Sequence, residues 1–229
     1  MRVYSIKRVL DYWPVGNFLE YGPGRGEITQ WLLDKGHSGT ACEISSTARN
    51  TLQEVLRRYQ DQITICEDSR DIPHAHFDYL FAFEVLEHIE DDIHYMRNWV
   101  RYLKPNGRAL FTVPAHQRKY GQDDEYVGHF RRYDRDCFVR LLQSAGLELD
   151  VIYNLGFPLG NITRIFSRWA FDYQMQDRTE YSGLERPSQY AKFRWLFNDV
   201  TMSPCNLFQC LFWKRDWGDN LLVLARKPH

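Results

Sequence analysis

Three histidines stand where they could take a proton from a substrate. His88 follows an apolar run at residues 77–83, and His116 and His129 lie in the polar, aromatic loop over residues 114–133. A hydroxyl or phenol with a pKa near 10 or above leaves little anion at neutral pH, so it benefits from a neutral imidazole as a base. We predict His129 as the general base, with His116 and His88 as alternatives. A carboxylate acceptor would need no base.

The same loop carries polar side chains that could orient a substrate. They are Tyr120, Arg131, Arg132 and Tyr133. A guanidinium group donates paired hydrogen bonds to planar anions, so a polar or anionic substrate is one interpretation. The other is that the two arginines form a solvated basic turn.

Three glycines at alternate positions predict a ligand-binding turn. Gly22, Gly24 and Gly26 lie between the apolar run 18–21 and a segment with helical periodicity at 28–32. Without a Cβ, they permit positive φ and close approach of a ligand, and the helix beyond begins with unpaired N–H groups. Nicotinamide and flavin enzymes share such turns, so the turn alone leaves the cofactor open.

Acidic residues end successive predicted strands and narrow the choice of cofactor. Glu20 precedes the turn, where it could accept from a cationic amino group but would be poorly placed beside a pyrophosphate. Glu43 stands about twenty residues beyond the turn, where an acid binds ribose hydroxyls. Asp68 and Ser69 follow the third strand, where a carboxylate can accept from an adenine amino group. The set suits a ligand with an ammonium group, a ribose and an adenine, but no phosphates.

These residues must be positioned by an alternating series of strands and helices. Predicted strands occupy residues 18–21, 39–44, 63–66, 77–83, 108–113, 147–153 and 221–225, with periodic helical segments between most of them. Such alternation predicts a mostly parallel sheet covered by helices on both faces, a doubly wound α/β fold.

One long segment breaks this alternation. Residues 155–217 are rich in aromatic side chains and too apolar for a disordered linker. We predict a core of residues 1–154 and 218–229 and a helical cap of residues 155–217. The cap could close a pocket over an apolar or aromatic acceptor, form a dimer surface, or lie on a membrane interface.

The composition excludes several classes of protein. A net charge of −1 gives no general attraction to nucleic acid, and no apolar run reaches membrane-spanning length. The N-terminal residues do not form a signal peptide, and the five cysteines lack CxxC spacing, so we expect a cytoplasmic protein with reduced thiols. His74 and His76 have no nearby third ligand, and we therefore predict no metal site.

Five segments carry a family resemblance. "LEYGPGRG", "ACEIS", "CEDSRDIP", "FDYLFAFEVLEHIEDD" and "LKPNGRALFTVPAH" resemble, in order, the motifs of class I S-adenosylmethionine-dependent methyltransferases. The resemblance implies a Rossmann-like, seven-stranded sheet with an antiparallel last strand. It also implies S-adenosyl-L-methionine as the cofactor and S-adenosyl-L-homocysteine as the product. Residues 128–149 resemble a substrate-side segment of a bacterial small-molecule subgroup.

The resemblance also assigns residues by motif position. Glu20 and the backbone of Gly22, Gly24 and Gly26 would hold the methionine part of the cofactor. Glu43, with Ile44 beside it, would hold the ribose, Asp68 and Ser69 would hold the adenine, and Glu84 would border the site.

We therefore expect metal-independent methyl transfer to a small molecule, at oxygen rather than nitrogen. An in-line displacement of this kind depends on the alignment of nucleophile and methyl group. One alternative is a nicotinamide-dependent oxidoreductase, against which Glu20 and the missing last glycine of GxGxxG argue. The other is a non-catalytic module that binds a nucleoside or a partner.

Overall fold

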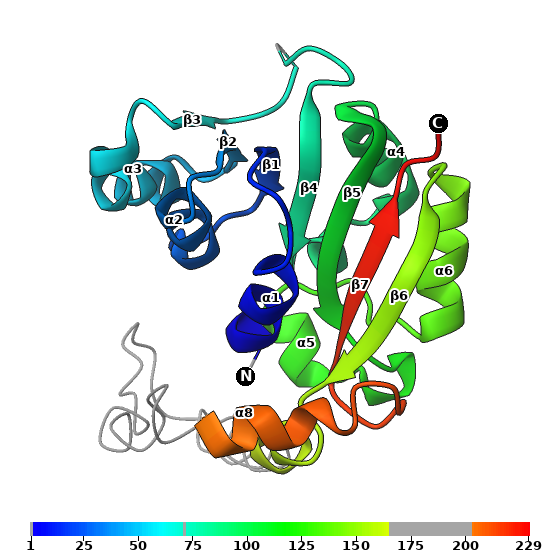
Figure 1. The fold of residues 1–229 in the computed structure, drawn as a ribbon. Helices are drawn as coiled ribbons and strands as arrows, with labels where there is room; N and C mark the ends of the chain where they lie inside the picture. Colours follow the sequence, from blue (N-terminus) through cyan, green and yellow to red (C-terminus); the bar gives the residue numbers. More distant parts are fainter. Residues whose placement is uncertain (1, 71, 165–202) are drawn as a thin grey trace, which may run out of the picture.

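The computed structural model describes residues 2–70, 72–164 and 203–229, and its centre is a seven-stranded sheet (Figure 1). The strand order is β3-β2-β1-β4-β5-β7-β6, and β7 runs antiparallel to both of its neighbours. The other neighbouring pairs, from β3 to β5, are parallel. The doubly wound, Rossmann-like sheet with an antiparallel last strand is thereby confirmed.

The elements of the core follow one another in a regular order. The strands are β1 (Asn17–Tyr21), β2 (Ser38–Cys42), β3 (Ile63–Cys66), β4 (Phe77–Phe83), β5 (Leu103–Pro114), β6 (Glu148–Leu155) and β7 (Asn220–Arg226). The helices are α1 (Arg2–Leu10), α2 (Glu27–Asp34), α3 (Ser46–Val55), α4 (Asp92–Val100), α5 (Gln122–Tyr126), α6 (Arg135–Ser144) and α8 (Ser203–Cys210). Short 3-10 helices cover Arg57–Tyr59, Leu86–His88 and Gln117–Lys119.

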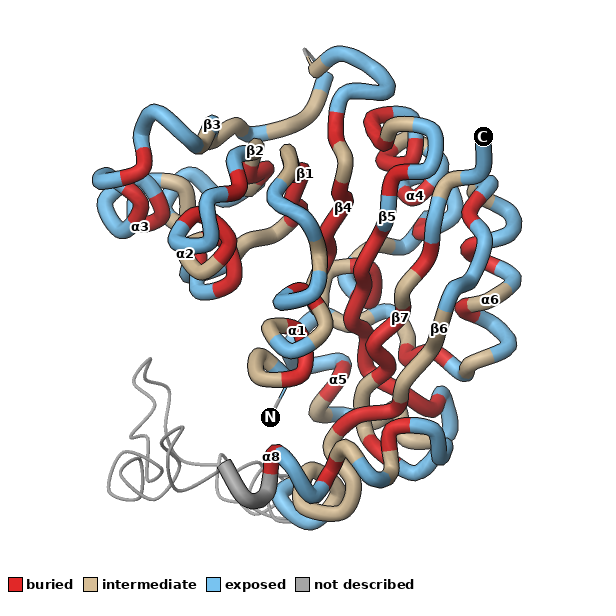
Figure 2. Tube along the Cα trace, in the orientation of Figure 1, coloured by how far each residue is buried: buried red, intermediate tan, exposed pale blue. Residues whose placement is uncertain are grey.

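Alternate side chains of the sheet enter two separate hydrophobic layers. In β4, Leu80 and Ala82 pack with residues of α4 and α6, whereas Tyr79 and Phe81 pack with residues of α1, α2 and α3. Successive side chains of a strand point to opposite faces, so a central strand covered on both sides must be apolar at nearly every position. Figure 2 shows buried residues running along β4, β5 and β7.

Two predicted boundaries were wrong. The second strand ends at Cys42, so Glu43 and Ile44 lie in the connection to α3 rather than in the strand. The fifth strand begins at Leu103 rather than at residue 108, and Asn106 within it has a φ of 61° and donates its N–H to the carbonyl of Lys227. The third and fourth strands have the predicted bounds.

Four cysteines of the described residues are not joined in disulfides. Cys42 is buried, Cys66 and Cys210 are partly buried, and Cys137 is exposed. Cys42 and Cys66 are register partners in the neighbouring strands β2 and β3. Both thiols lie at the ends of their strands, Cys42 directly before Glu43 and Cys66 two residues before Asp68.

Part of the predicted cap is described, and part lies outside the described residues. Residues 165–202 are not described, and they include much of the aromatic segment. In the described part, Phe157 contacts the rings of Phe212 and Trp217, with centroid separations of 5.1 and 5.2 Å. Leu207 and Phe208 of α8 are about half exposed, at 53% and 49%. The division into a core and a cap stays a prediction.

Membrane crossing was not expected from the sequence. Within the described ranges, no helix is both long and apolar enough to cross a membrane.

Candidate active site

The glycine turn connects β1 to α2 and is closed on one side and open on the other. Gly22, Gly24 and Gly26 have φ values of 63°, 57° and 73°, in the left-handed region that favours glycine. A Cβ on Gly22 would lie 2.6 Å from the side chain of Val85, and one on Gly26 would lie 2.6 Å from the side chain of Leu52. A Cβ on Gly24 would meet nothing within 4 Å among the described atoms. The middle of the turn therefore leaves its backbone open to a ligand.

Glu20 lies beneath this turn. Its side chain is buried, and its Oε2 accepts a 2.6 Å hydrogen bond from the hydroxyl of Thr29 in α2. Burial raises the pKa of Glu20 to about 7, and the Thr29 hydrogen bond opposes part of that rise. The carboxyl group therefore joins β1 to the first turns of α2 and fixes the shape of the glycine turn between them.

Glu43 and Ile44 follow β2 in a connection held by Arg49. The guanidinium of Arg49 donates to the carbonyls of both residues, at 2.7 Å each. Glu43 is half-buried and its Oε1 accepts from the N–H of Ser45 at 3.0 Å. Ile44 is 79% exposed. An exposed apolar side chain beside a carboxylate fits an adenosine-like ligand.

Asp68 and Ser69 follow β3, and Tyr21 positions the side chain of Ser69. The hydroxyl of Tyr21 donates to Ser69 Oγ at 2.8 Å, while its ring stacks on Trp99 at 4.3 Å. Asp68 accepts from Arg70, whose hydrogen bonds hold the pKa of the carboxyl below its ordinary value. The side chain of Asp68 is 40% exposed and borders a hollow of about 390 Å³.

These placements fit S-adenosylmethionine. The glycine turn, Glu43 with Ile44, and Asp68 with Ser69 all follow strands whose last residues are register partners, Tyr21 with Cys42 and Cys42 with Cys66. The carboxyl ends of these strands form one edge, where ligands of open α/β sheets bind. The open backbone at Gly24 and the exposed side chain of Ile44 are both available at this edge.

Glu84 follows β4 in a strained conformation. Its φ is 57°, which is uncommon for a residue with a side chain. Its carboxylate accepts from Asn220 at 3.1 Å and pairs with Arg2 of α1 at 2.9 Å. The predicted border residue thus joins the N-terminal helix and the start of β7 to the same edge.

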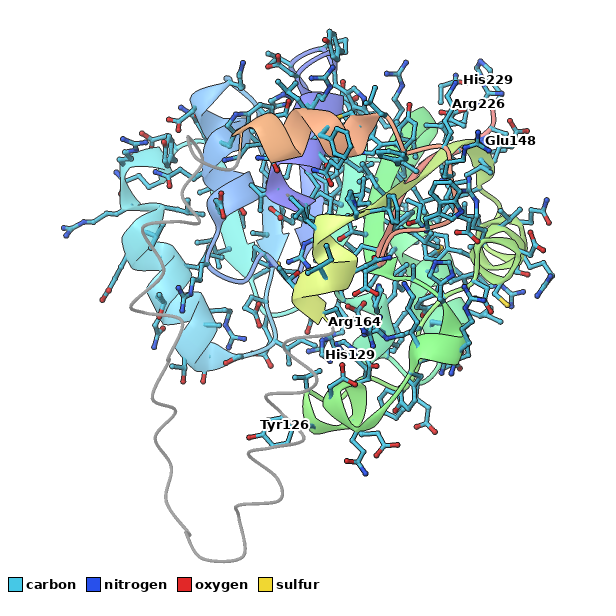
Figure 3. The ribbon with its side chains drawn as sticks, turned by 90° about the horizontal axis from the view of Figure 1, so that it is seen from below. Tyr126, His129, Glu148, Arg164, Arg226 and His229 are labelled. Atoms are coloured by element: carbon cyan, nitrogen blue, oxygen red, sulfur yellow. The ribbon has the colours of Figure 1, made fainter. Side chains whose placement is uncertain are left out.

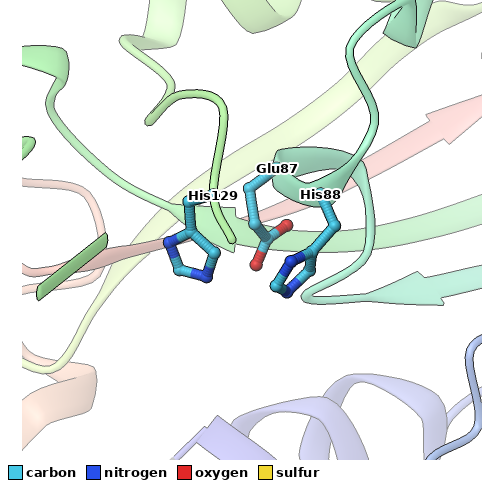
Figure 4. A group of neighbouring side chains, drawn as sticks. All are labelled: Glu87, His88 and His129. Atoms are coloured by element: carbon cyan, nitrogen blue, oxygen red, sulfur yellow. The ribbon is translucent and has the colours of Figure 1, made fainter. Parts of the chain in front are cut away.

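The next turn contains a group that the sequence did not assign to the site. Glu87 is fully buried, and neither of its carboxylate oxygens has a hydrogen-bond partner in the described part of the chain. Burial, reinforced by the nearby charge of Glu84, raises the pKa of Glu87 to about 9. Figure 4 shows its carboxylate between the rings of His88 and His129, whose centroids are 4.7 Å apart. One side-chain N or O atom from each of the three residues lies within 4.8 Å of the others.

Both histidine rings are oriented by their Nδ1 atoms. His129 Nδ1 is 2.9 Å from Asp124 Oδ1, and His88 Nδ1 is 3.2 Å from the carbonyl oxygen of Gly128. Each acceptor requires a proton on Nδ1 of a neutral ring, so Nε2 carries the lone pair. The structure thus fixes a common tautomer for the two rings.

Asp124 in α5 is the centre of a buried ionic network. Although burial alone would raise its pKa, hydrogen bonds from Arg132 and His129 hold the pKa of this carboxyl below its ordinary value. Arg132 donates to it at 2.7–2.9 Å, and Arg164 approaches it at 3.6 Å. Asp219 accepts from Arg164 at 3.0 Å. The network ties the loop that carries His129 to the beginning of β7.

The predicted substrate residues all make contacts within the protein. The hydroxyl of Tyr120 donates to the carbonyl of His129 at 2.8 Å. Arg131 and the hydroxyl of Tyr133 both bind Asp92 Oδ2, at 3.2 and 2.7 Å. Arg132 binds the carboxylate at the centre of the ionic network. These contacts hold the loop in place, and substrate binding by the four residues stays a prediction.

The three predicted bases are not all together. His116 stands near the start of the loop, whereas His129 stands near its end. His116 is buried, and its Nε2 lies 3.8 Å from Asp216 Oδ1, in the segment before β7. Burial and the nearby charge of Lys119 lower the pKa of His116. Among the predicted bases, the structure brings His88 and His129 together and places His116 against a different partner.

A hollow of about 330 Å³ is linked to His129 through side chains that pair with one another. Arg2, Arg164 and Asp219 are among the residues that line it. Arg2 connects it to Glu84, while Arg164 connects it through Asp124 to His129. Figure 3, seen from the carboxyl edge of the sheet, shows Arg164 and His129 near each other.

The chain is similar to a known family over most of its core. Residues 5–151 match the family model described as a methyltransferase domain. None of the curated protein sequences matches the chain. This match decides between methyl transfer and the nicotinamide-dependent alternative in favour of methyl transfer.

Solved structures share the fold at low sequence identity. A putative sarcosine dimethylglycine methyltransferase from Galdieria sulphuraria aligns with 99% of this chain and 84% of its own, at 14% identity and a TM-score of 0.66. A 1,6-didemethyltoxoflavin-N1-methyltransferase from Burkholderia thailandensis, with bound S-adenosylhomocysteine, aligns with 100% of this chain and 77% of its own, at 16% identity and a TM-score of 0.59.

A third similar structure holds the cofactor itself. Phosphoethanolamine N-methyltransferase 2 from Haemonchus contortus, in complex with S-adenosyl-L-methionine, has a TM-score of 0.63 at 18% identity. The alignment covers 98% of this chain and 52% of that one. The chain therefore belongs to the methyltransferase domain family and has the class I S-adenosylmethionine-dependent fold that its motifs implied.

Proposed function

We propose that the protein transfers the methyl group of S-adenosylmethionine to a hydroxyl oxygen of a small molecule. The observation that carries this proposal is the group formed by Glu87, His88 and His129, in the segments that follow β4 and β5. A hydroxyl becomes a good nucleophile only when its proton is removed or its pKa is lowered. Two imidazoles with a lone pair on Nε2 are suited to that task.

The cofactor supplies an electrophilic methyl group on a sulfonium. The chain would hold it with the glycine turn, with Glu43 and Ile44, and with Asp68 and Ser69. These residues come from the β1–β3 side of the sheet, whereas the histidines follow β4 and β5. Binding of the cofactor and activation of the acceptor are thus assigned to separate sets of residues. The two sets meet where β1 and β4 lie side by side in the sheet.

The hydrogen bond between His129 and Asp124 suits His129 to act as a base or as a ligand. Asp124 fixes the tautomer and orientation of His129 and would stabilise positive charge on the ring, as buried carboxylates do for catalytic histidines. The Nε2 of such a ring can act in two ways. It can take a proton itself, or it can bind a cation that lowers the pKa of the hydroxyl.

The surroundings of the hollow support an acceptor with an apolar or aromatic body. Gly156 lines the hollow, and the next residue, Phe157, packs against Phe212 and Trp217. Ligand sites are commonly lined by such side chains with a few polar groups among them. Arg2 and Arg164 supply polar groups at the same hollow.

Product analysis tests this function. The purified protein is incubated with S-adenosylmethionine labelled on its methyl group and with matched small aromatic compounds that carry a hydroxyl, an amino group or only hydrogen at one position. We expect labelled product and S-adenosylhomocysteine only with the hydroxyl compounds. Methylation of the amino compounds alone would overturn the choice of oxygen. Cofactor binding without turnover of any compound would favour the non-catalytic module.

A further inference from the structure

We propose that Glu87, His88 and His129 bind a divalent first-row transition-metal ion, of which Zn²⁺ and Mn²⁺ are the examples to test. The role of the ion in catalysis rests on the proposed function, but its binding does not. The sequence predicted no metal site because the three ligands are not grouped along the chain. His129 is distant in sequence from Glu87 and His88 and reaches them only in the fold.

The arrangement of the side chains favours coordination. The three potential ligand atoms lie within 4.8 Å of one another, and Figure 4 shows the carboxylate placed between the two rings. Metal–ligand bonds to imidazole and carboxylate are about 2.0–2.2 Å long, so in tetrahedral geometry two ligand atoms are about 3.3–3.6 Å apart. Binding of an ion would draw the three atoms together to these distances.

The carboxyl group of Glu87 is buried without a hydrogen-bond partner among the described residues. It is fully buried, and no hydrogen-bond partner exists for either oxygen within residues 2–70, 72–164 and 203–229. An isolated buried carboxylate is costly unless it is neutralised, paired or bound to a metal. The two arginines whose charges act on Glu87 are already paired, Arg2 with Glu84 and Arg132 with Asp124. A bound cation would displace the proton from Glu87 and supply the partner that its oxygens lack.

The histidines have the outer hydrogen bonds that metal ligands require. A histidine bound to a metal through one nitrogen usually donates its other N–H to a carboxylate or a carbonyl. His129 does so to Asp124, and His88 does so to the carbonyl of Gly128. The backbone adds a further constraint, because the N–H of Phe130 donates to the carbonyl of Glu87 at 2.7 Å. The loop and the turn after β4 thus hold the ligands in a fixed relation.

The ligand types select the class of ion. Two imidazole nitrogens and one carboxylate suit zinc, manganese and related ions, whereas Mg²⁺ prefers oxygen ligands and keeps several waters. Three protein ligands also leave positions open on the ion. A hydroxyl that binds at an open position has a lower pKa, so the site would serve an oxygen acceptor directly. In this arrangement His129 is a ligand rather than the predicted base.

Calorimetry on the full chain tests the binding without any measurement of activity. The protein is freed of affinity tags, treated with a chelator, and titrated with Zn²⁺, Mn²⁺ and Mg²⁺. We expect one zinc or manganese ion per chain and binding of Mg²⁺ at least about tenfold weaker. Co²⁺ should give a visible absorption spectrum with the wild-type protein. The absence of binding by zinc, manganese and cobalt would overturn the proposal.

Matched variants identify the ligands. Glu87→Gln, His88→Gln and His129→Gln should each weaken zinc binding about tenfold or more and change the cobalt spectrum. His94→Gln is the control, because the ring of this exposed histidine contacts Asn98 and Tyr95 of its own helix, α4. Melting curves show whether each variant is folded. Zinc affinity that is the same in all three variants as in the wild type would place the ion elsewhere and overturn the assignment.

The outcomes for the metal and for the proposed function are distinct. If the three variants lose metal binding and the wild type methylates no oxygen acceptor, the metal site is supported and the proposed function is overturned. Oxygen methylation that persists in the chelator-treated protein, with no ion bound, leaves the function in place and overturns the metal site.

Discussion

The hydroxyl of Thr29 donates a 2.6 Å hydrogen bond to Glu20 Oε2 beneath the glycine turn. This contact joins β1 to α2 through a carboxyl group that is only 2% exposed. The pKa of Glu20 is raised to about 7, above its ordinary value of 4.5, chiefly because burial disfavours the charged form. The folded state therefore binds the proton more tightly than the unfolded state.

The stability of the cofactor-free protein should decrease as the pH rises through this interval. The contribution of the protonated Glu20 is fully present below about pH 4.5 and is lost as the pH rises through about 7, for a total of about 3 kcal/mol. Urea unfolding measured between pH 5 and pH 8 checks this. Glu20→Gln should reduce the slope by its own share, while the share of Glu87, whose pKa is also raised, should remain. Glu54→Gln, at an exposed position of α3, should leave the slope unchanged. An identical slope in wild type and Glu20→Gln would contradict the prediction.

The acids beyond β2 and β3 should control cofactor affinity. Glu43→Ala and Asp68→Ala should each weaken binding of S-adenosylhomocysteine by about 1–3 kcal/mol, because each removes a hydrogen-bond acceptor from polar groups of the ligand. Their melting temperatures without ligand should remain near that of the wild type. Calorimetry measures the affinities, and NAD should not bind.

The control for this pair is Glu67→Ala. Glu67 lies next to Asp68, but its exposed carboxylate pairs with Arg49. Its loss should leave the affinity unchanged. If both Glu43→Ala and Asp68→Ala bind as tightly as the wild type, the acids do not hold the cofactor.

Two glycines of the turn should respond differently to alanine. Gly24→Ala and Gly26→Ala both place a side chain in the left-handed region, which costs about 1–2 kcal/mol. In Gly26→Ala the new Cβ also meets Leu52 at 2.6 Å, whereas in Gly24→Ala it meets open space. Gly26→Ala should therefore be the less stable variant by about 1 kcal/mol or more. Urea unfolding curves compare them, and equal stabilities would be inconsistent with the contact at Leu52.

The buried network predicts a large effect at Asp124. Asp124→Ala should destabilise the protein by about 3–5 kcal/mol, because it leaves Arg132 buried without its main partner. Asp123→Ala should cost much less, since Asp123 is 25% exposed and its contact with Arg164 is 3.5 Å long. Thermal and urea unfolding measure both losses. If the two variants lose similar free energies of unfolding, the burial of Asp124 does not increase its contribution to stability.

Much of the fold could be predicted because each strand is a short apolar run with a clear end. The bounds of β3 and β4 follow from Ile63–Cys66 and Phe77–Phe83 alone. The start of α4 follows from Asp91, which accepts from the N–H of His94 at 3.1 Å. The course of β5 could not be predicted, because the continuation through Asn106 depends on a hydrogen bond to Lys227 near the end of the chain. The N-terminal helix α1 was also not predicted.

The shared location of the acids that we predict to bind the cofactor follows from the sequence for a similar reason. Glu20, Glu43 and Asp68 stand at or just beyond the ends of parallel strands, and the order of those strands alone brings them to one edge. The closeness of Glu87 and His129 does not follow from the order of the strands. It depends on the path of the loop, which α5 and the Asp124 network determine. A carboxylate between apolar residues, in the stretch Leu86-Glu87-His88-Ile89, was the only local sign of burial.

The Asp124 network also decides which part of the molecule could be exchanged between relatives to change acceptor preference. Loop residues 114–133 could not be transplanted alone, because Lys119 and Arg132 pair with Asp219 at the start of β7, and Arg164 pairs with both Asp124 and Asp219. A chimaera that keeps these charges matched must take the loop together with the segment that leads into β7. Residues 17–70, with the glycine turn and the acids, could stay unchanged. With the site residues assigned as proposed, acceptor preference and cofactor affinity could therefore be engineered as independent modules.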